Sequence, residues 1–464
     1  MVDIIENLNT IIDKEDFSGA SIGLFSIHFE FYEIAKILHN QGHLPSAILC
    51  ISDVEKELQI MGIRLYSVKQ FAEKYSDQAV IFLRESEYLI HKCMLSENGF
   101  IINKNVFVDC ERKGFLYLLR LWIEEVKRKP EIFKHKVFGR CRALLLYAKA
   151  FWHQVKGYRI YKKIREKHPA PNLPIYIYDY SGMGDVYVFC LYLKANRGLI
   201  APDGMILTVV GNVSKKVADM FQICDVVKLT KNESQLLTHL ARFSSEVFNL
   251  HPMTPFPAHM HTDIYSHYLF GKRINMAEAY QYVMFSLAET KIEYPVLDTQ
   301  PDKVKALFDK YNLPKGQTVI ISPYANTIIG YPMEFWDIII KRLKKQGFSV
   351  CTNCSGKEPA LPGAPAFPFG LDIAEEVLDY AGYFLALRSG FCDVVCNSQA
   401  FKCILYPDYH IFNANVYEFC SLEKMGIGRN FVEICWDYSE LETTLTDLVL
   451  KTFRHAMYFR TCVG

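Results

Sequence analysis

Short apolar segments that alternate with helix-length spacers are the feature that most constrains this fold. Residues 47–51, 206–210 and 318–322 are among the clearest of these segments. Parallel strands need a crossover between them, and a helix commonly supplies it. Strands that alternate with helical spacers therefore predict a parallel sheet covered by helices. The segments fall into three groups along the chain, which predicts an α/β protein with three wound parts.

The composition agrees with several buried cores. The chain has 464 residues, of which 50% are hydrophobic and 22% charged, so it is not a disordered protein. This length corresponds to about two to four domains. The formal net charge is only +1, so the whole-chain charge gives no indication of nucleic-acid binding.

We divide the chain into four parts. Residues 1–110 are predicted to form a small Rossmann-like domain, and residues 111–170 a basic helical linker. Residues 171–295 and 296–464 are predicted to form two further Rossmann-like lobes. The last lobe ends in a helix, residues 441–460, which we expect to pack back across both lobes.

The first domain lacks the glycine-rich turn of a dinucleotide site. Asp53 follows the second predicted strand, where a dinucleotide-binding domain holds the ribose. The first turn, residues 26–30, reads Ser-Ile-His-Phe-Glu, without the glycines that let backbone approach a pyrophosphate. We therefore interpret residues 1–110 as a structural or recognition module. An NAD-linked enzyme is the disfavoured alternative.

The linker concentrates positive charge. Residues 127–167 contain fourteen Lys or Arg residues and two acids, Glu131 and Glu166, for a formal charge of +12. Aromatic residues such as Phe138, Trp152 and Tyr161 are interleaved with the cations. A basic helical surface of this kind suits an anionic membrane face. The alternative is a solvated connector whose aromatic residues pack on the neighbouring lobe. Nucleic acid is disfavoured, because no known binding module accompanies the charge.

The cysteines and the N-terminus bear on the compartment. Fourteen cysteines are scattered along the chain and predict neither a disulfide framework nor a zinc site. Cys351 and Cys354 form a C-x-x-C pair, which we interpret as ordinary small buried residues. No signal-peptide pattern is present, and no stretch reaches the ~18 apolar residues of a spanning helix. We therefore expect a cytoplasmic protein.

A strand, a glycine turn and a helix open the third part. Residues 173–179 read as a strand, and Gly182, Gly184 and Asp185 lie in the turn before the next helix. This layout exposes backbone N–H groups at a helix N-terminus, and glycines let a substrate approach the backbone. An inverting sugar transfer needs one general base, and Asp185 is placed to serve as one. The alternative is that Asp185 only caps the helix it opens.

These motifs resemble a known family. The segment Ser181-Gly-Met-Gly-Asp-Val186 is similar to the start of the ADP-heptose lipopolysaccharide heptosyltransferases, glycosyltransferase family 9. Two second-lobe segments, residues 320–336 and 385–390, are similar to that family's strand with its Trp-bearing helix and to its glycine turn. The resemblance covers residues 171–406. It implies a GT-B fold in which residues 171–295 bind the acceptor and residues 296–464 bind a nucleotide-sugar donor.

The resemblance also implies roles for single residues. Asp185 corresponds to the family's proposed base, and Arg388, Ser389 and Gly390 correspond to the turn against the donor. The family usually has an acid where Arg388 stands, and its phosphate-pairing lysine has no equivalent in residues 326–332. A guanidinium binds a diphosphate through two parallel hydrogen bonds, so Arg388 can replace that charge. These departures favour a donor other than heptose. The alternative is a surface Arg388 paired with Asp393.

Further candidates follow the predicted strand ends. Asn326 and Thr327 are predicted to contact the donor phosphates, and Lys357 or Glu358 the nucleotide, with solvated turns as the alternative. His259 and His261 are candidates for acceptor recognition or a plain surface loop. Metal binding by these histidines is disfavoured, because it requires a third ligand.

These interpretations lead to one predicted function. We expect a metal-independent, inverting glycosyltransferase that needs no cofactor and uses its nucleotide-sugar donor as a substrate. The expected acceptor is a glycan or lipid-linked glycan of bacterial surface polysaccharide, either lipopolysaccharide or capsule. We also expect peripheral association with the anionic inner-membrane surface through residues 127–167 and no binding to nucleic acid. The alternative is a non-catalytic scaffold or nucleotide-sugar-binding protein of a polysaccharide assembly complex.

Overall fold

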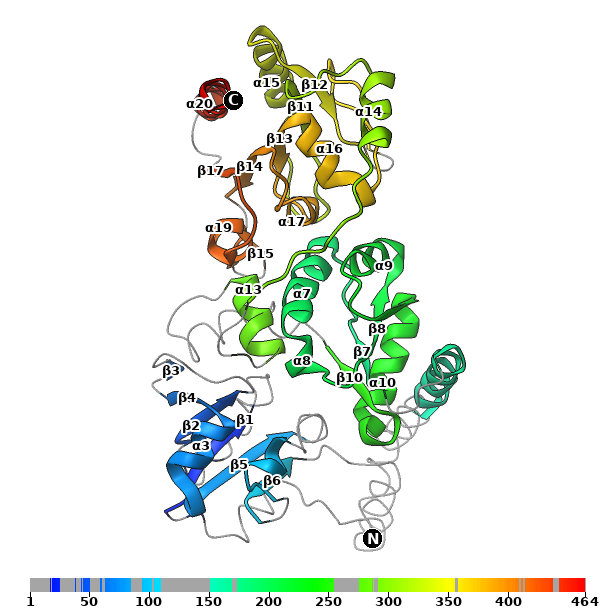
Figure 1. Ribbon diagram of the computed structural model, residues 1–464, viewed down its shortest axis with the longest axis vertical. Coiled ribbons are helices and arrows are strands. Elements are labelled where there is room, and N and C mark those ends of the chain that lie inside the picture. The colour runs from blue at the N-terminus through cyan, green and yellow to red at the C-terminus, as the bar shows by residue number, and fades with distance from the viewer. Residues whose placement is uncertain are drawn as a thin grey trace, which may run out of the picture.

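The structure is a computed structural model, in which three α/β units follow one another along the long axis (Figure 1). It describes residues 17, 19–25, 38, 43, 45–50, 59–60, 63–84, 94–101, 104–109, 151–168, 173–253, 275–285, 287, 291–354, 358–408, 410–411, 414–436 and 442–463.

The first unit is a Rossmann-like sheet, as predicted. Its six strands have the order β3-β4-β2-β1-β5-β6, and all pairs except β3–β4 are parallel. The capping box at Ser67 and Gln70 starts its helix, because each side chain accepts a hydrogen bond from the other residue's backbone N–H. The elements are β1 (Ser21–Phe25), β2 (Ala47–Cys50), β3 (Gln59–Ile60), β4 (Ile63–Ser67), α3 (Val68–Tyr75), β5 (Ala79–Arg84) and β6 (Val106–Asp109). Asp53 and the turn at residues 26–30 lie outside the described residues.

The described end of the basic linker is a helix. Residues 151–167 are helical, as predicted, whereas residues 111–150 lie outside the described part of the chain.

The second unit, here called the first lobe, is a four-stranded parallel sheet with the order β10-β7-β8-β9. Thr230 starts its longest helix through reciprocal hydrogen bonds with Glu233. The elements are β7 (Ile175–Ile177), α7 (Met183–Ala195), α8 (Arg197–Ile200), β8 (Ile206–Val210), α9 (Gly211–Met220), β9 (Asp225–Leu229), α10 (Lys231–Phe248) and β10 (Leu250–Pro252). A second capping box, at Asn275 and Glu278, starts α13 (Met276–Glu278), which continues as a π-helical segment, η4 (Ala279–Met284).

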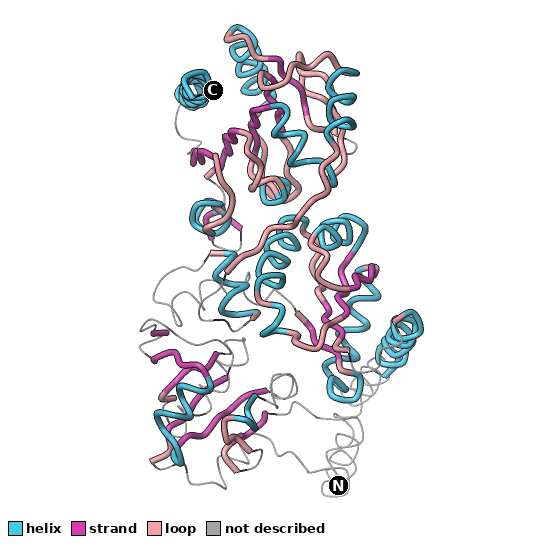
Figure 2. The backbone as a smooth tube through the Cα atoms, in the orientation of Figure 1, coloured by secondary structure: helices cyan, strands magenta, loops and turns pink. Residues whose placement is uncertain are grey.

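The third unit, the second lobe, has a five-stranded parallel sheet with the order β12-β11-β13-β14-β17. Helices lie on its faces, as the tube in Figure 2 shows. The elements are α14 (Pro301–Lys310), β11 (Thr318–Ser322), α15 (Met333–Lys345), β12 (Ser349–Thr352), η5 (Leu371–Ile373), α16 (Ala374–Ala381), β13 (Gly382–Leu387), α17 (Gly390–Val394), β14 (Phe401–Pro407), β15 (His410–Ile411), β16 (Ala414–Asn415), α18 (Val416–Cys420), α19 (Leu422–Met425), β17 (Phe431–Trp436) and α20 (Glu442–Val463).

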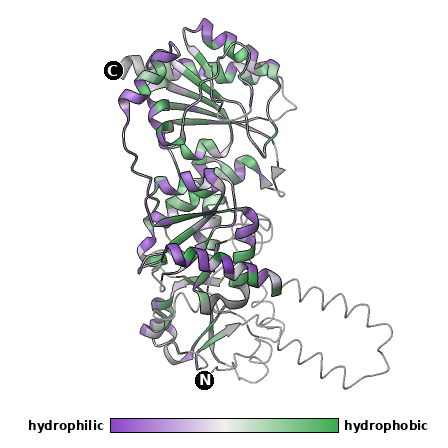
Figure 3. Ribbon diagram, turned by 90° about the vertical axis from the view of Figure 1, so that its right-hand side faces the viewer, coloured by the Kyte–Doolittle hydropathy of each residue, from purple (hydrophilic) through white to green (hydrophobic). Residues whose placement is uncertain are grey.

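One buried apolar cluster extends through both lobes. It contains most of α7 and the buried strands of the second-lobe sheet. Figure 3 shows these strands as hydrophobic and the outer helices as mixed. The prediction of two Rossmann-like lobes after a smaller Rossmann-like domain is therefore confirmed.

The C-terminal helix differs from its prediction. Among the described side chains of α20, the buried apolar ones are Leu445, Val449, Leu450 and Phe453, and the helix packs on α15 and β14. Phe453 contacts Phe348, Tyr383 and Phe401, all in the second lobe. The helix therefore packs on the second lobe. The predicted packing across both lobes is not seen.

The described cysteines carry free thiols. Cys351 lies buried in β12, as predicted, and burial raises the pKa of its thiol well above the ordinary value, whereas Cys354 is only half-buried, unlike its prediction. Among the described residues, no helix is both long and apolar enough to span a membrane.

Candidate active site

The donor candidates of the second lobe follow neighbouring strands. The strand β11 lies between β12 and β13, and the chain passes from β11 to β12 on one side before returning to β13 on the other. Ligands of open α/β sheets bind where the strand order reverses in this way, beyond the carboxyl ends of the strands. Asn326 and Thr327 follow β11, whereas Ser389 and Gly390 follow β13. The structure thus brings these four residues to one switch point.

The first lobe has its own switch point, between β7 and β10. The glycine turn follows β7, and α7 begins at Met183, with Gly182 as the residue before it. The helix therefore begins three residues before residue 186, and Asp185 belongs to its first turn. Gly182 makes no side-chain cap. The carboxylate of Asp185 folds back over it, because a Cβ on Gly182 would lie 2.0 Å from Asp185 Oδ2.

The two glycine turns meet between the lobes. A Cβ on Gly184 would lie 2.0 Å from Asp393 Oδ2 and 2.8 Å from Gly390 Cα. A Cβ on Gly390 would lie 2.6 Å from the backbone nitrogen of Gly184. The helices α7 and α17 accordingly lie side by side (Figure 1). This contact needs glycine at both positions.

The protein environment favours the protonated form of the Asp185 carboxyl group more than water does. Burial raises the pKa of its carboxyl group to about 6. A backbone hydrogen bond, the charge of Arg388 and a hydrogen bond from Tyr280 each lower this pKa and limit the increase. A carboxylate with a pKa just below neutrality is ionised at pH 7 and is a stronger base than an ordinary aspartate.

The sequence did not predict that two tyrosines, Tyr178 and Tyr280, lie near Asp185. The Tyr178 and Tyr280 hydroxyl oxygens lie 2.7 Å apart in a hydrogen bond, and both side chains are fully buried. Tyr178 follows β7, whereas Tyr280 comes from η4. A separation of 102 residues leaves no local motif that links them. The position of Tyr178 directly after a buried strand was the only available signal.

Arg388 is a buried residue with protein partners. Its side chain forms a two-point ion pair with Asp393, with Nη2 to Oδ1 at 2.7 Å and Nη1 to Oδ2 at 3.0 Å. Its Nε donates to the Cys420 carbonyl oxygen at 2.9 Å, and Nη1 also donates to the Ser389 carbonyl oxygen. The pairing with Asp393 was the alternative considered from the sequence, but a surface location is wrong because only 3% of Arg388 is exposed.

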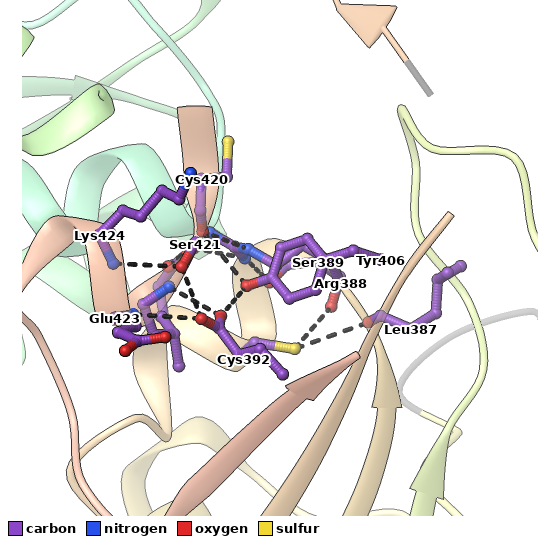
Figure 4. A network of polar contacts seen from close by, with 12 residues as sticks. Leu387, Arg388, Ser389, Cys392, Tyr406, Cys420, Ser421, Glu423 and Lys424 are labelled. Carbon is purple, nitrogen blue, oxygen red and sulfur yellow. Dashed lines mark hydrogen bonds and ion pairs between the residues drawn. The ribbon is translucent and has the colours of Figure 1, made fainter. Parts of the chain in front are cut away.

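The ion pair is held by a wider network (Figure 4). Tyr406 donates its hydroxyl hydrogen bond to Glu433 and lies 3.3 Å from the Cys420 carbonyl oxygen, which Arg388 also contacts. The Glu433 carboxylate accepts hydrogen bonds from the Ser421 hydroxyl and from the Leu422 backbone N–H. This arrangement connects the turn after β13 to α19. Burial raises the pKa of Asp393 to about 6, although the Arg388 guanidinium acts in the opposite direction.

The remaining candidate residues make no described contact with the two glycine turns. Asn326, Thr327 and Glu358 are exposed. Lys357, His259 and His261 lie outside the described residues. Within the part of the chain that is described, no three His, Cys, Asp or Glu side chains are grouped so that they could hold a metal ion.

Sequence comparisons do not identify a family. No protein-family model matches the chain. No curated protein matches it either.

Comparison with solved structures finds similar folds at low identity. ADP-heptose lipopolysaccharide heptosyltransferase II of E. coli has a TM-score of 0.44 and 13% identity, over 62% of this chain and 100% of that chain. A glycosyl transferase family 9 protein of Veillonella parvula has a TM-score of 0.42 and 10% identity, over 62% and 97%. The E. coli heptosyltransferase WaaC, solved with ADP-2-deoxy-2-fluoro heptose, has a TM-score of 0.37 and 12% identity, over 61% and 99%.

Proposed function

We propose that the chain from residue 171 onward is an inverting, metal-independent glycosyltransferase that uses a nucleotide-sugar donor. The observation that carries the proposal is the contact between two glycine turns, one bearing Asp185 and the other formed by Ser389 and Gly390. Each turn lies at the switch point of its own sheet. A base from one lobe and a donor-binding turn from the other therefore converge between the lobes.

Asp185 acts as the general base in this proposal. Its carboxylate takes the proton from an acceptor hydroxyl as the hydroxyl oxygen attacks the anomeric carbon of the donor. The bond between that carbon and the diphosphate oxygen breaks on the opposite face, and the nucleoside diphosphate leaves. Tyr280 positions the carboxylate through the hydrogen bond it donates. One such base suffices for inversion.

The second lobe holds the donor. Asn326, Thr327, Ser389 and Gly390 offer side-chain and backbone donors to the diphosphate at the switch point, and Lys357 and Glu358 follow β12 on the nucleotide side. Direct contact between Arg388 and the diphosphate remains a prediction, and it requires the diphosphate to compete with Asp393. At its present place, Arg388 supplies positive charge near Asp185.

The proposed acceptor is a glycan or lipid-linked glycan of bacterial surface polysaccharide. Gly182, His259 and His261 are candidates for contact with it on the first lobe, whereas the space at Gly184 is filled by Gly390 and Asp393 of the second lobe. We extend the proposal to a peripheral place at the cytoplasmic face of the inner membrane, where lipid carriers are accessible. The charge of +12 in residues 127–167 supports this extension.

Nucleotide binding and turnover test the proposal in sequence. A thermal-shift screen of nucleoside diphosphates should find one that raises the melting temperature, since a ligand of the folded state stabilises it. The matching nucleotide sugars are then assayed for turnover with lipid-linked glycan acceptors. Asp185→Asn should keep the thermal shift and lower turnover by about 10²–10⁴-fold, the usual contribution of a general base.

Each outcome has a distinct meaning. Turnover by Asp185→Asn at the wild-type rate overturns the base assignment. If no nucleoside diphosphate stabilises the protein and no nucleotide sugar is consumed, the transferase proposal fails and a scaffold is favoured. Asp219→Asn is the matched control, because Asp219 is an exposed carboxylate paired only locally with Lys215 on α9.

A further inference from the structure

The helix of residues 151–167 has one face that is fixed on the first lobe. Ile160 and Ile164 are buried against Leu236 and Leu240 of α10. Gly157 lies at the closest approach, because a Cβ there would lie 2.4 Å from the Leu236 carbonyl oxygen. Close backbone contact of this kind determines which side of the helix faces outward.

An exposed face beside this contact combines aromatic residues with cations. Phe151 and Trp152, the first two described residues of the helix, are 54% and 58% exposed, with ring centroids 6.4 Å apart. An α-helix turns by about 100° per residue, so residues three, four and seven apart share a face. The exposed Lys156, Arg159 and Lys163 follow Trp152 at this spacing.

The charge of the helix is mostly positive. Residues 151–167 contain six Lys or Arg residues and one acid, Glu166. On α10, hydrogen bonds from Thr230 lower the pKa of the Glu233 carboxyl group, and the charge of Lys163 contributes to this lowering. Positive charge therefore dominates the outward face.

We propose that this face docks on an anionic phospholipid surface. Trp and Phe side chains partition to the headgroup level of a bilayer, and each nearby Lys or Arg adds attraction to anionic headgroups. The cations run along the helix beside the aromatic pair, which suits a flat charged surface. This inference deepens the proposed function. The role of the docking face, to bring a lipid-linked acceptor to the enzyme, rests on that proposed function. The vesicle binding itself can be measured without donor or acceptor.

Vesicle cosedimentation with the full chain tests the docking face. Phosphatidylcholine vesicles with phosphatidylglycerol should bind the protein, and pure phosphatidylcholine vesicles should bind it far less. The triple variant Lys156→Gln, Arg159→Gln, Lys163→Gln should lose on the order of a hundredfold in affinity, as about 1 kcal/mol per cation implies. Phe151→Ala with Trp152→Ala should also weaken binding.

A matched control has the same change in charge. Lys305→Gln, Lys310→Gln, Lys345→Gln removes three exposed cations from the second lobe and should leave vesicle binding unchanged. Equal loss in both triple variants would overturn the assigned face, as would wild-type protein that ignores phosphatidylglycerol. Stronger binding to single-stranded RNA than to anionic vesicles, lost in the first triple variant, would reassign the face to nucleic acid and overturn the lipid proposal.

The two proposals can fail separately. A protein that consumes a nucleotide sugar with a soluble acceptor but does not bind vesicles loses the docking face and the proposed membrane location, and keeps the transferase. A protein that binds vesicles but consumes no nucleotide sugar loses only the proposed transferase.

Discussion

Gly184 and Gly390 contact each other between the two lobes, each in the glycine turn that begins a helix after a central strand. A Cβ on Gly390 would lie 2.6 Å from the backbone nitrogen of Gly184. Neither glycine has the positive φ that would itself demand glycine. Both positions therefore require glycine because the space between the lobes has no room for a side chain.

Gly184→Ala should weaken the contact between the lobes. Alanine normally favours a helix by about 1 kcal/mol over glycine. Here its methyl group would overlap Asp393 Oδ2, and overpacking costs about 1–3 kcal/mol. We expect a lower free energy of unfolding, measured by urea denaturation, and a larger radius of gyration by small-angle scattering if the lobes separate.

Gly198→Ala is the matched control. Gly198 lies in α8 with no atom within 4 Å of the position of a Cβ, so alanine should be neutral or stabilising. Equal stability of the Gly184→Ala variant and wild type would show that the lobes do not need this close approach.

The pH dependence of turnover should follow Asp185. Since burial raises the pKa of this carboxyl group to about 6, the proposed base is lost as the pH falls through that value. The rate should decline about tenfold per pH unit below it. Stopped assays of nucleoside diphosphate release over a pH series measure this, and a rate that stays constant down to about pH 4 would contradict it.

Asp185 should also lower stability at neutral pH. Its folded-state pKa lies above the ordinary value of 3.8, so the folded protein holds this proton more tightly than the unfolded chain. Stability is then fully present below about pH 4 and falls as the pH rises to about 6. Asp185→Asn should accordingly raise the free energy of unfolding by about 3 kcal/mol above pH 6 and change it little near pH 4. A lower melting temperature of this variant at neutral pH would contradict the assignment.

The sheets could be predicted well because their signal is local. The segments 206–210 and 318–322 match β8 and β11, since buried parallel strands read as continuous apolar runs. The strand β17 was missed, because its burial alternates and Glu433 interrupts the apolar pattern. The packing of α20 depends on distant aromatic contacts, which no local pattern contains.

The candidate site could be predicted only in part for the same reason. The turn at Gly182 to Asp185 and the turn at Ser389 and Gly390 are local motifs, and the structure brings them together. Tyr280 could not be found, because its partner Tyr178 is far away in the sequence. The burial of Arg388 could not be inferred either, since it depends on Cys420 and its neighbours closing over the turn.

Breaking the buried ion pair should be costly. Arg388→Met leaves the Asp393 carboxylate buried without its partner, for which about 3–5 kcal/mol of destabilisation is expected. The double variant with Asp393→Leu should recover part of this loss, because it removes the unpaired charge. Urea denaturation measures both. As a control, Arg342→Met breaks an exposed pair with Asp447 and should cost less than about 1 kcal/mol. A similar small loss in Arg388→Met would contradict the structural role of the pair.

Tyr280→Phe should move the pH dependence of turnover. The hydrogen bond from Tyr280 lowers the pKa of Asp185, so its loss should raise that pKa by about one unit. The acid limb of the rate profile should move upward by the same amount, and so should the Asp185 carboxyl titration followed by ¹³C NMR, which needs no turnover. Tyr176→Phe removes another buried hydroxyl, which donates to the Ile200 carbonyl oxygen at 2.9 Å, and controls for stability loss. Equal titration of Asp185 in wild type and Tyr280→Phe would exclude the tyrosine as a positioning residue, whereas a shift that Tyr176→Phe does not share would establish it.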